Sequence, residues 1–218
     1  MSASAANGRF GETPPKPAQN FPAGVGARTF VAIDVGPAVR AEVARVIQAI
    51  SGKIEAVKTP PKVVWVKAAA LHVTLRFIGE VGEAAVPDLC ARLAPPMAMV
   101  PFDVEWRGIG AFPSTRHPRA LWLGIVSGGA RLGELEAEVT RRLTGVLDPE
   151  ARPLLPHLTL GRIKMAGAGM DWPKLLQALD VRHATSRVDR VILYRSQLSH
   201  QGPHYTELVS APLAAKNK

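Results

Sequence analysis

Apolar residues follow two patterns along the chain, short runs typical of buried strands and stripes at helical spacing. The run RTFVAID, from Arg28, predicts a buried strand, and Pro37 then suits the first position of a helix. The apolar stripe of that helix consists of Val39, Val43, Val46, Ile47 and Ile50. After two prolines, KVVWV and LHVTLRFIG predict strands, and a helix follows with an apolar stripe at Val86, Leu89 and Leu93.

The second half of the chain shows the same alternation. FDVEWRGIGAF and ALWLGIV predict strands, and the next helix carries an apolar stripe at Leu132, Leu135, Val139 and Leu143. HLTLGRI predicts a further strand, a short helix is expected around residues 175–179, and the strands RVDRVILYRSQL and HYTELVS complete the pattern. Strands and helices interleaved with hairpins favour an α+β fold over a parallel doubly wound sheet.

The order of these elements suggests an internal duplication. FVAID, its helix and HVTL in the first half correspond to ALWLGIV, its helix and HLTL in the second. Outside these segments the similarity is weak, so two arms of one α+β domain that share an order of elements remain an alternative. A duplication predicts a pseudo-twofold cleft in which the two motifs face each other.

The ends of the chain show neither pattern. Residues 1–27 are rich in Pro, Gly and Ala and bury too little apolar surface to offset the entropy of ordering, so we expect a flexible tail. One two-lobed domain over residues 28–213 and a short tail over residues 214–218 follow. The hydrophobic share of 47% suits a soluble globular protein. No run is apolar enough to span a membrane and no secretion signal is present, so we expect a cytoplasmic protein without membrane contact.

Positive charge exceeds negative charge, with 27 Lys and Arg against 18 Asp and Glu and a net charge of +9. Such an excess attracts phosphate-rich partners through its long-range field and through counterion release. Nucleic acid is therefore indicated as a substrate or ligand. A basic surface without a partner is the alternative that charge alone leaves open.

Two copies of the tetrapeptide His-x-Thr-Leu carry the candidate chemistry. Because side chains alternate between the faces of a strand, His72 and Thr74 project to one side while their neighbours enter the core. His157 and Thr159 repeat this arrangement. A single strand histidine is more often structural, but two copies at corresponding places of a duplication favour a shared catalytic site.

Two opposed histidines suit phosphodiester cleavage, since one removes a proton from attacking water and the other protonates the leaving oxygen. The threonine hydroxyls would hold the non-bridging phosphate oxygens. Arg162 would bind the same phosphate only if a bend at Gly161 turns it toward His157, because its odd spacing otherwise places it on the opposite face. Arg76 shares the face of His72 in a regular strand. For both arginines, a surface charge is the alternative.

Other residues add less. No H-E-x-x-H, acidic cluster, P-loop or K-x-D-G pattern is present, so no metal or other cofactor is expected. Phe112, Trp65 and Tyr205 are candidates for stacking a terminal base. Packing in the core or a loop is the alternative, and the sequence favours it for each of the three.

At these residues the chain resembles the 2H phosphoesterase superfamily and, within it, the RNA 2',3'-cyclic phosphodiesterases formerly called 2'-5' RNA ligases. The resemblance extends over residues 28–213 and rests on TFVAID, VVWVKAAALHVTLRFIGEV, GIGAFPS with ALWLGI, PHLTLGRI and SQLSHQGPHYTEL. It implies a bilobal α+β fold, with two antiparallel sheets flanking a central cleft and helices on the outside. The N-terminal tail lies outside the resemblance.

The resemblance also implies an activity, hydrolysis of a terminal 2',3'-cyclic phosphate to a 2'-phosphate on RNA 3' ends, tRNA-like or otherwise single-stranded. It implies no metal or nucleotide, and a reversible, ATP-independent 2'-5' joining of RNA ends. The residues that match the motif are His72, Thr74, His157, Thr159 and Arg162, with His72 as acid and His157 as base by analogy.

Two other functions stay open. The first is a noncatalytic module that binds RNA ends, against which the intact motifs speak. The second is a 2H phosphodiesterase that acts on a small cyclic phosphate nucleotide, and the net charge of +9 favours RNA over it. We expect a monomer, although no sequence pattern reports the oligomeric state.

Overall fold

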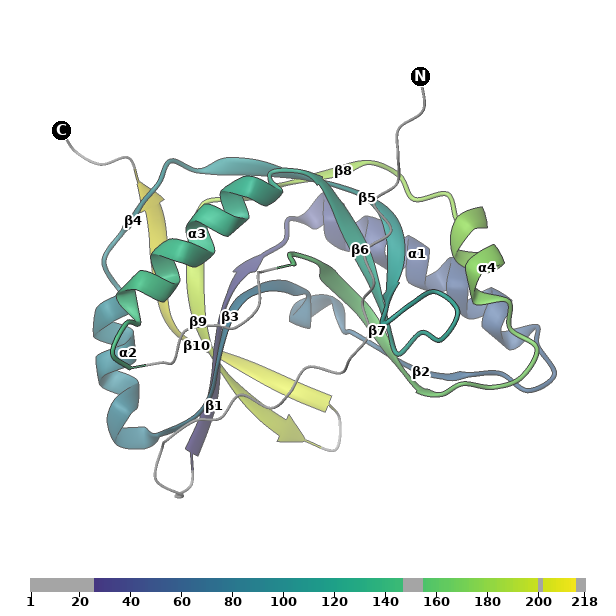
Figure 1. Ribbon diagram of the computed structural model, residues 1–218, viewed down its shortest axis with the longest axis horizontal. Helices are drawn as coiled ribbons and strands as arrows, with labels where there is room; N and C mark the ends of the chain where they lie inside the picture. Colours follow the sequence, from purple (N-terminus) through teal and green to yellow (C-terminus); the bar gives the residue numbers. More distant parts are fainter. Residues whose placement is uncertain (1–25, 147–154, 200–201, 215–218) are drawn as a thin grey trace.

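The computed structural model describes residues 26–146, 155–199 and 202–214 (Figure 1). Within these residues the chain forms two five-stranded sheets. The first sheet, in the order β3-β1-β9-β10-β4, has the strands β1 Gly26–Asp34, β3 His72–Gly82, β4 Met97–Ala98, β9 Arg190–Ser199 and β10 Gly202–Ala214. The second sheet, in the order β2-β7-β6-β5-β8, has the strands β2 Lys62–Trp65, β5 Phe102–Phe112, β6 Ala120–Ser127, β7 Leu158–Met165 and β8 Ala184–Val188.

Strand pairing in both sheets is antiparallel, except that β4 and β10 run parallel. In the first sheet β1 pairs with β3, and in the second β6 pairs with β7. The segments β1–α1–β3 and β6–α3–β7 therefore repeat one arrangement, in which the first strand pairs with the strand of the histidine motif. The predicted α+β fold of two duplicated lobes is confirmed.

Helices cover the outer faces of both sheets. Those of the described part are α1 Pro37–Glu55, α2 Val86–Leu93, α3 Gly129–Arg142 and α4 Trp172–Ala178, with 3-10 turns at Ala68–Ala70 and Glu83–Ala85. α1 contacts β8 and α4 contacts β5, so both lie on the second sheet, whereas α3 contacts β3 and α2 contacts β10 on the first sheet (Figure 1). α1 thus follows β1 of the first sheet and packs on the second sheet, whereas α3 follows β6 of the second sheet and packs on the first.

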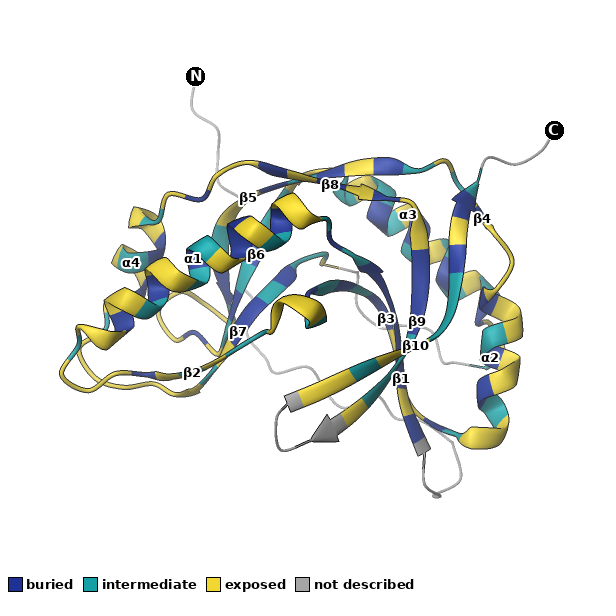
Figure 2. Ribbon diagram, turned by 180° about the vertical axis from the view of Figure 1, so that it is seen from behind, coloured by how far each residue is buried: buried dark blue, intermediate teal, exposed yellow. Residues whose placement is uncertain are grey.

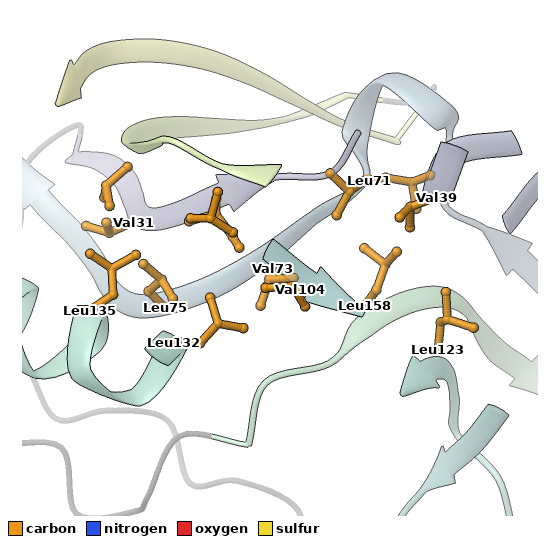
Figure 3. Close-up of a cluster of buried hydrophobic side chains, with 14 of the residues drawn as sticks. Val31, Val39, Leu71, Val73, Leu75, Val104, Leu123, Leu132, Leu135 and Leu158 are labelled. Carbon is orange, nitrogen blue, oxygen red and sulfur yellow. The ribbon is translucent and has the colours of Figure 1, made fainter. Parts of the chain in front are cut away.

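The helix faces explain this packing. Buried and exposed residues alternate along α1 in Figure 2, and its buried residues recur at helical spacing. In Figure 3, Leu132 and Leu135 of α3 lie beside Leu75 of β3, and Leu158 of β7 lies in the same cluster. Each fully buried leucine contributes about 2 kcal/mol of burial free energy. One continuous apolar core therefore holds the lobes together.

One predicted strand was wrong in its extent. The segment RVDRVILYRSQL divides at Asp189. Its first two residues end β8 and its residues from Arg190 onward form most of β9, and these two strands lie in different sheets. The chain crosses between sheets there because β8 pairs with β5 while β9 pairs with β1. The short strand β4 was not predicted.

The first and last strands of the described residues lie at the two ends of the domain. β1 begins at Gly26 rather than at Arg28, and β10 ends at Ala214. The two expected tails fall, apart from these strand ends, on residues 1–25 and 215–218, which lie outside the described residues. In the part of the chain that the structure describes, no helix combines the length and the apolar character needed to cross a membrane.

Candidate active site

Strand pairing fixes the direction of the first histidine motif. Directly opposite residues of an antiparallel pair share a face of the sheet. His72 lies opposite Asp34, and Thr74 lies opposite Ala32. Val73, between them, is completely buried on the other face. His72 and Thr74 therefore share the face that does not carry α3.

The second motif has the same arrangement on β7. Thr159 lies opposite Trp122 and both are half-buried, whereas Leu158 lies opposite Leu123 and both are completely buried. His157 directly precedes β7 and is half-buried. We call the faces of β3 and β7 that carry the two His-x-Thr pairs the histidine face.

The two imidazole rings are held in the same way. Nδ1 of His72 lies 2.8 Å from the carbonyl oxygen of Ala70, and Nδ1 of His157 lies 2.7 Å from that of Leu155. Since a carbonyl oxygen only accepts hydrogen bonds, each Nδ1 carries a proton and donates it. Each Nε2 is thereby left available for proton transfer.

The electrostatic surroundings of the two histidines differ. Burial lowers the pKa of His72, the hydrogen bond to Ala70 and the negative charge of Asp34 oppose this, and the charge of His157 adds to it. Burial also lowers the pKa of His157, with the hydrogen bond to Leu155 opposing the drop and the positive charge of Arg162 adding to it. Of the two histidines, only His72 has an acidic neighbour that favours its protonated form.

Asp34 is a residue that the sequence did not single out. Its carboxylate accepts hydrogen bonds from the Tyr194 hydroxyl at 3.2 Å and from Nη2 of Arg190 at 3.1 Å. Nη2 of Arg40 lies 3.7 Å from the same carboxylate. Only the pairing of β1 with β3 places Asp34 opposite His72, and a single sequence does not report that pairing.

Arg162 reaches the histidine face through a β-bulge. Thr159 lies opposite Trp122 and Gly161 lies opposite Leu121, so Leu160 is the extra residue on β7. The bulge reverses the alternation, and Arg162 comes to share the face of Thr159. Consistent with this position, its charge lowers the pKa of both His157 and Tyr205.

The expectation that Arg76 faces the phosphate is wrong. A second bulge makes Leu75 the extra residue on β3, so Arg76 lies opposite Val31 on the helix-covered face. Its side chain is 5% exposed, and Nη1 lies 4.0 Å from Oε1 of Glu136 on α3. Phe77 takes its place on the histidine face, opposite Phe30, with 56% of its surface exposed.

Trp65, a candidate for base stacking for which the sequence favoured packing, does not lie beside the histidines. Trp65 lies opposite Gly161, on the face that α1 covers, and not on the histidine face. A Cβ atom on Gly161 would come within 2.6 Å of Cε3 of Trp65, so the indole ring covers that glycine directly. Trp65 therefore packs against β7 from the side opposite the histidine face.

The other two aromatic candidates lie beside the histidines. The ring centroid of Phe112 is 4.9 Å from that of His157, and that of Tyr205 is 5.1 Å from that of His72, both in edge-on contact. Phe30, which the sequence did not single out, lies 4.8 Å from His72. Burial raises the pKa of Tyr205, so its hydroxyl stays protonated near neutral pH. Aromatic rings therefore border both imidazoles.

Known proteins share this combination of fold and sequence. The family model described as "2'-5' RNA ligase superfamily" matches residues 35–199. An RNA 2',3'-cyclic phosphodiesterase of Aeropyrum pernix is 38% identical over 149 residues, which cover 67% of this chain and 84% of that protein. An RNA 2',3'-cyclic phosphodiesterase of Thermotoga maritima is 31% identical over 182 residues, 83% of this chain and 92% of that protein. The solved structure of TT0787 of Thermus thermophilus has a TM-score of 0.65 at 26% identity and covers 87% of this chain and 100% of that chain.

Proposed function

Because the chain belongs to the 2'-5' RNA ligase superfamily, we propose that it hydrolyses the 2',3'-cyclic phosphate at RNA 3' ends to a 2'-phosphate. One observation carries the proposal. His72 and His157, one from each lobe, are both half-buried, are held by their Nδ1 atoms on backbone carbonyls and stand at the start of β3 and directly before β7, two strands that contact each other. The two relatives named RNA 2',3'-cyclic phosphodiesterase support the same reaction.

The proposed reaction uses one histidine as base and the other as acid. Nε2 of His157 takes a proton from water, and the water oxygen forms a bond to phosphorus. As the bond between phosphorus and O3' breaks, Nε2 of protonated His72 gives its proton to O3'. The phosphate remains on O2', and exchange of protons with solvent returns both histidines to their starting states.

The charge distribution supports this assignment of roles. An acid must start protonated, and Asp34 favours the protonated form of His72. A base must start unprotonated, and Arg162 disfavours the protonated form of His157. The pseudo-symmetric motifs by themselves do not distinguish these roles.

Three further side chains would bind the phosphate. The hydroxyls of Thr74 and Thr159 would donate hydrogen bonds to its non-bridging oxygens, where negative charge develops. Arg162 would add a charge-assisted contact from the second lobe. Phe112 and Tyr205 would contact the terminal base or ribose from opposite sides of the phosphate, since each borders a different histidine.

We further propose that neither metal nor nucleotide takes part. Within the described residues, no group of three or more His, Cys, Asp or Glu side chains is arranged to hold a metal ion. Acid, base and phosphate donors are all supplied by side chains of the histidine face. If a 5'-hydroxyl replaces the attacking water, the same steps join RNA ends through a 2'-5' linkage without ATP.

A direct assay tests the proposal. The full chain is incubated, in EDTA, with an RNA oligonucleotide that ends in a 2',3'-cyclic phosphate, alongside His72→Ala and His157→Ala. We expect the wild-type protein to yield only a 2'-phosphate and each variant to lose at least a hundredfold in kcat/KM, as for a general acid or base. Activity that EDTA abolishes, or that either variant retains, would contradict the mechanism.

The same assay separates the alternatives. A noncatalytic module would bind the oligonucleotide without releasing product. A phosphodiesterase for small cyclic phosphates would turn over ADP-ribose 1'',2''-cyclic phosphate faster than the oligonucleotide. The basic charge of the chain favours the oligonucleotide.

A further inference from the structure

The outer end of the second sheet has an unusual charge distribution. Three neighbouring segments, residues 57–67, 113–119 and 158–168, contain no Asp or Glu. We call these three segments the basic end. The basic end carries seven exposed cations, Lys58, Lys62, Lys67, Arg116, Arg119, Arg162 and Lys164. Among the described residues, no acidic side chain forms an ion pair with any of them.

The three segments lie together in space. β2 pairs with β7, and Figure 1 shows the loop between β5 and β6 beside these two strands. At the base of that loop, the backbone N–H of Arg119 donates to the carbonyl of Phe112, and the carbonyl of Arg119 accepts from the N–H of Ile163. The cations therefore surround one edge of the sheet.

Part of this surface is continuous with the histidine face. Val64 lies opposite Arg162, and Lys62 lies opposite Met165; the extra residue between these pairs, Lys164, belongs to β7, so Lys62 and Val64 share a face of β2. Met165 lies opposite Lys62 and is 62% exposed, while Val64 is 48% exposed. Positive and apolar side chains thus alternate from Arg162 toward the outer end.

The first sheet offers a different surface. There Arg190, on the same face as His72, is paired with Asp34 at 3.1 Å, and the exposed Arg28 of β1 lies directly opposite Glu80 of β3. Glu80 and Glu207 are exposed on β3 and β10. A polyanion would be repelled by these carboxylates and attracted to the basic end, where no carboxylate competes for the cations.

We propose that the basic end binds the RNA strand that leads to the cyclic phosphate. The proposal rests on the proposed function and specifies its substrate class, because only a polymeric RNA carries phosphates upstream of its 3' end. Lys62, Arg116 and Lys164 contact those phosphates, and the exposed Val64 and Met165 contact bases. The protein consequently binds oligonucleotides far more tightly than cyclic mononucleotides, and the difference falls as salt rises.

Binding of the reaction product tests the proposal without turnover. Fluorescence anisotropy measures the Kd of a labelled RNA oligonucleotide ending in a 2'-phosphate as a function of salt. The triple variant Lys62→Ala, Arg116→Ala and Lys164→Ala is compared with Lys53→Ala, Lys174→Ala and Arg182→Ala. The control removes the same charge from exposed residues of α1, α4 and the segment before β8.

In the basic-end variant, we expect the slope of log Kd against log salt to fall by about 2, at about 0.7 for each phosphate that is no longer neutralised. At low salt its Kd should rise at least tenfold, whereas the control variant and the turnover of 2',3'-cyclic AMP should match the wild-type protein. Equal slopes in both variants, or equal losses on oligonucleotide and mononucleotide, would overturn the proposal. Failure of the proposed function would give a different result from failure of this proposal, because the wild-type protein would then hydrolyse no cyclic phosphate at all.

Discussion

At the scale of single residues, the two histidines differ in the charge nearest to them. His72 lies opposite Asp34 on the neighbouring strand, whereas His157 lies near Arg162. The Nδ1 hydrogen bonds are equivalent, so the tautomers do not distinguish the rings. Charge is therefore the property that makes a duplicated site asymmetric, and it can be changed one residue at a time.

Substitution of Asp34 tests the role of His72. Asp34 raises the pKa of His72, so Asp34→Asn should lower that pKa. If His72 is the acid, it must be protonated, and activity in the variant should be lost at a lower pH than in the wild-type protein. The profile of kcat/KM against pH should thus shift on its alkaline limb, with the exposed Asp88→Asn as control. A shift of the acidic limb instead would make His72 the base.

At the scale of elements, a β-bulge at the leucine of each motif determines which of the following side chains lies on the histidine face. On β3 the bulge replaces Arg76 with Phe77, and on β7 it brings in Arg162. Gly161 permits the second bulge to pack, because the ring of Trp65 occupies the position of its missing side chain. The packing of β2 on β7 thus supports the placement of a proposed phosphate ligand.

A methyl group at this glycine should be costly. Gly161→Ala places Cβ 2.6 Å from the indole of Trp65 and should lower the free energy of unfolding by about 1–3 kcal/mol through overpacking. Denaturant unfolding measures this loss. Gly133→Ala in α3, where no atom lies within 4 Å, is the matched control and should be neutral or stabilising. Equal stability of the two variants would contradict the contact.

At the scale of the whole molecule, the lobes are joined by exchanged helices. α3 belongs to the second lobe in sequence and packs on the first sheet, where Glu136 pairs with the buried Arg76. α1 is exchanged in the opposite direction and reaches β8. Since each lobe completes its core with the helix of the other, the two His-x-Thr strands pack on one shared core.

Replacement of Arg76 distinguishes a structural role from phosphate binding. Arg76→Met should lower the free energy of unfolding by about 3 kcal/mol, because Glu136 keeps its charge while this cation is removed. Its kcat/KM, measured well below the unfolding temperature, should match the wild-type value. A large loss of kcat/KM at unchanged stability would instead indicate that Arg76 binds the phosphate.

The sequence determined the elements and the reaction class. Hydrophobic periodicity predicted the α+β fold, nearly all the strands and the duplication, because side-chain alternation and helical stripes are local properties. The two His-x-Thr-Leu motifs indicated His72, Thr74, His157 and Thr159 as candidates, and strand pairing places His72 and Thr74 on one face of β3 and Thr159 on the corresponding face of β7. Alternation within a strand sufficed for these residues because no bulge separates each histidine from its threonine.

Only the tertiary structure decided which other residues lie around the two His-x-Thr pairs. Arg76 and Arg162 exchanged their expected faces because a bulge depends on the partner strand, which the local pattern does not contain. Trp65 lies on the other face because of the way β2 pairs with β7, and Asp34 lies beside His72 because β1 pairs with β3. The crossing at Asp189 and the exchange of α1 and α3 were likewise decided by contacts between distant segments, which no local periodicity encodes.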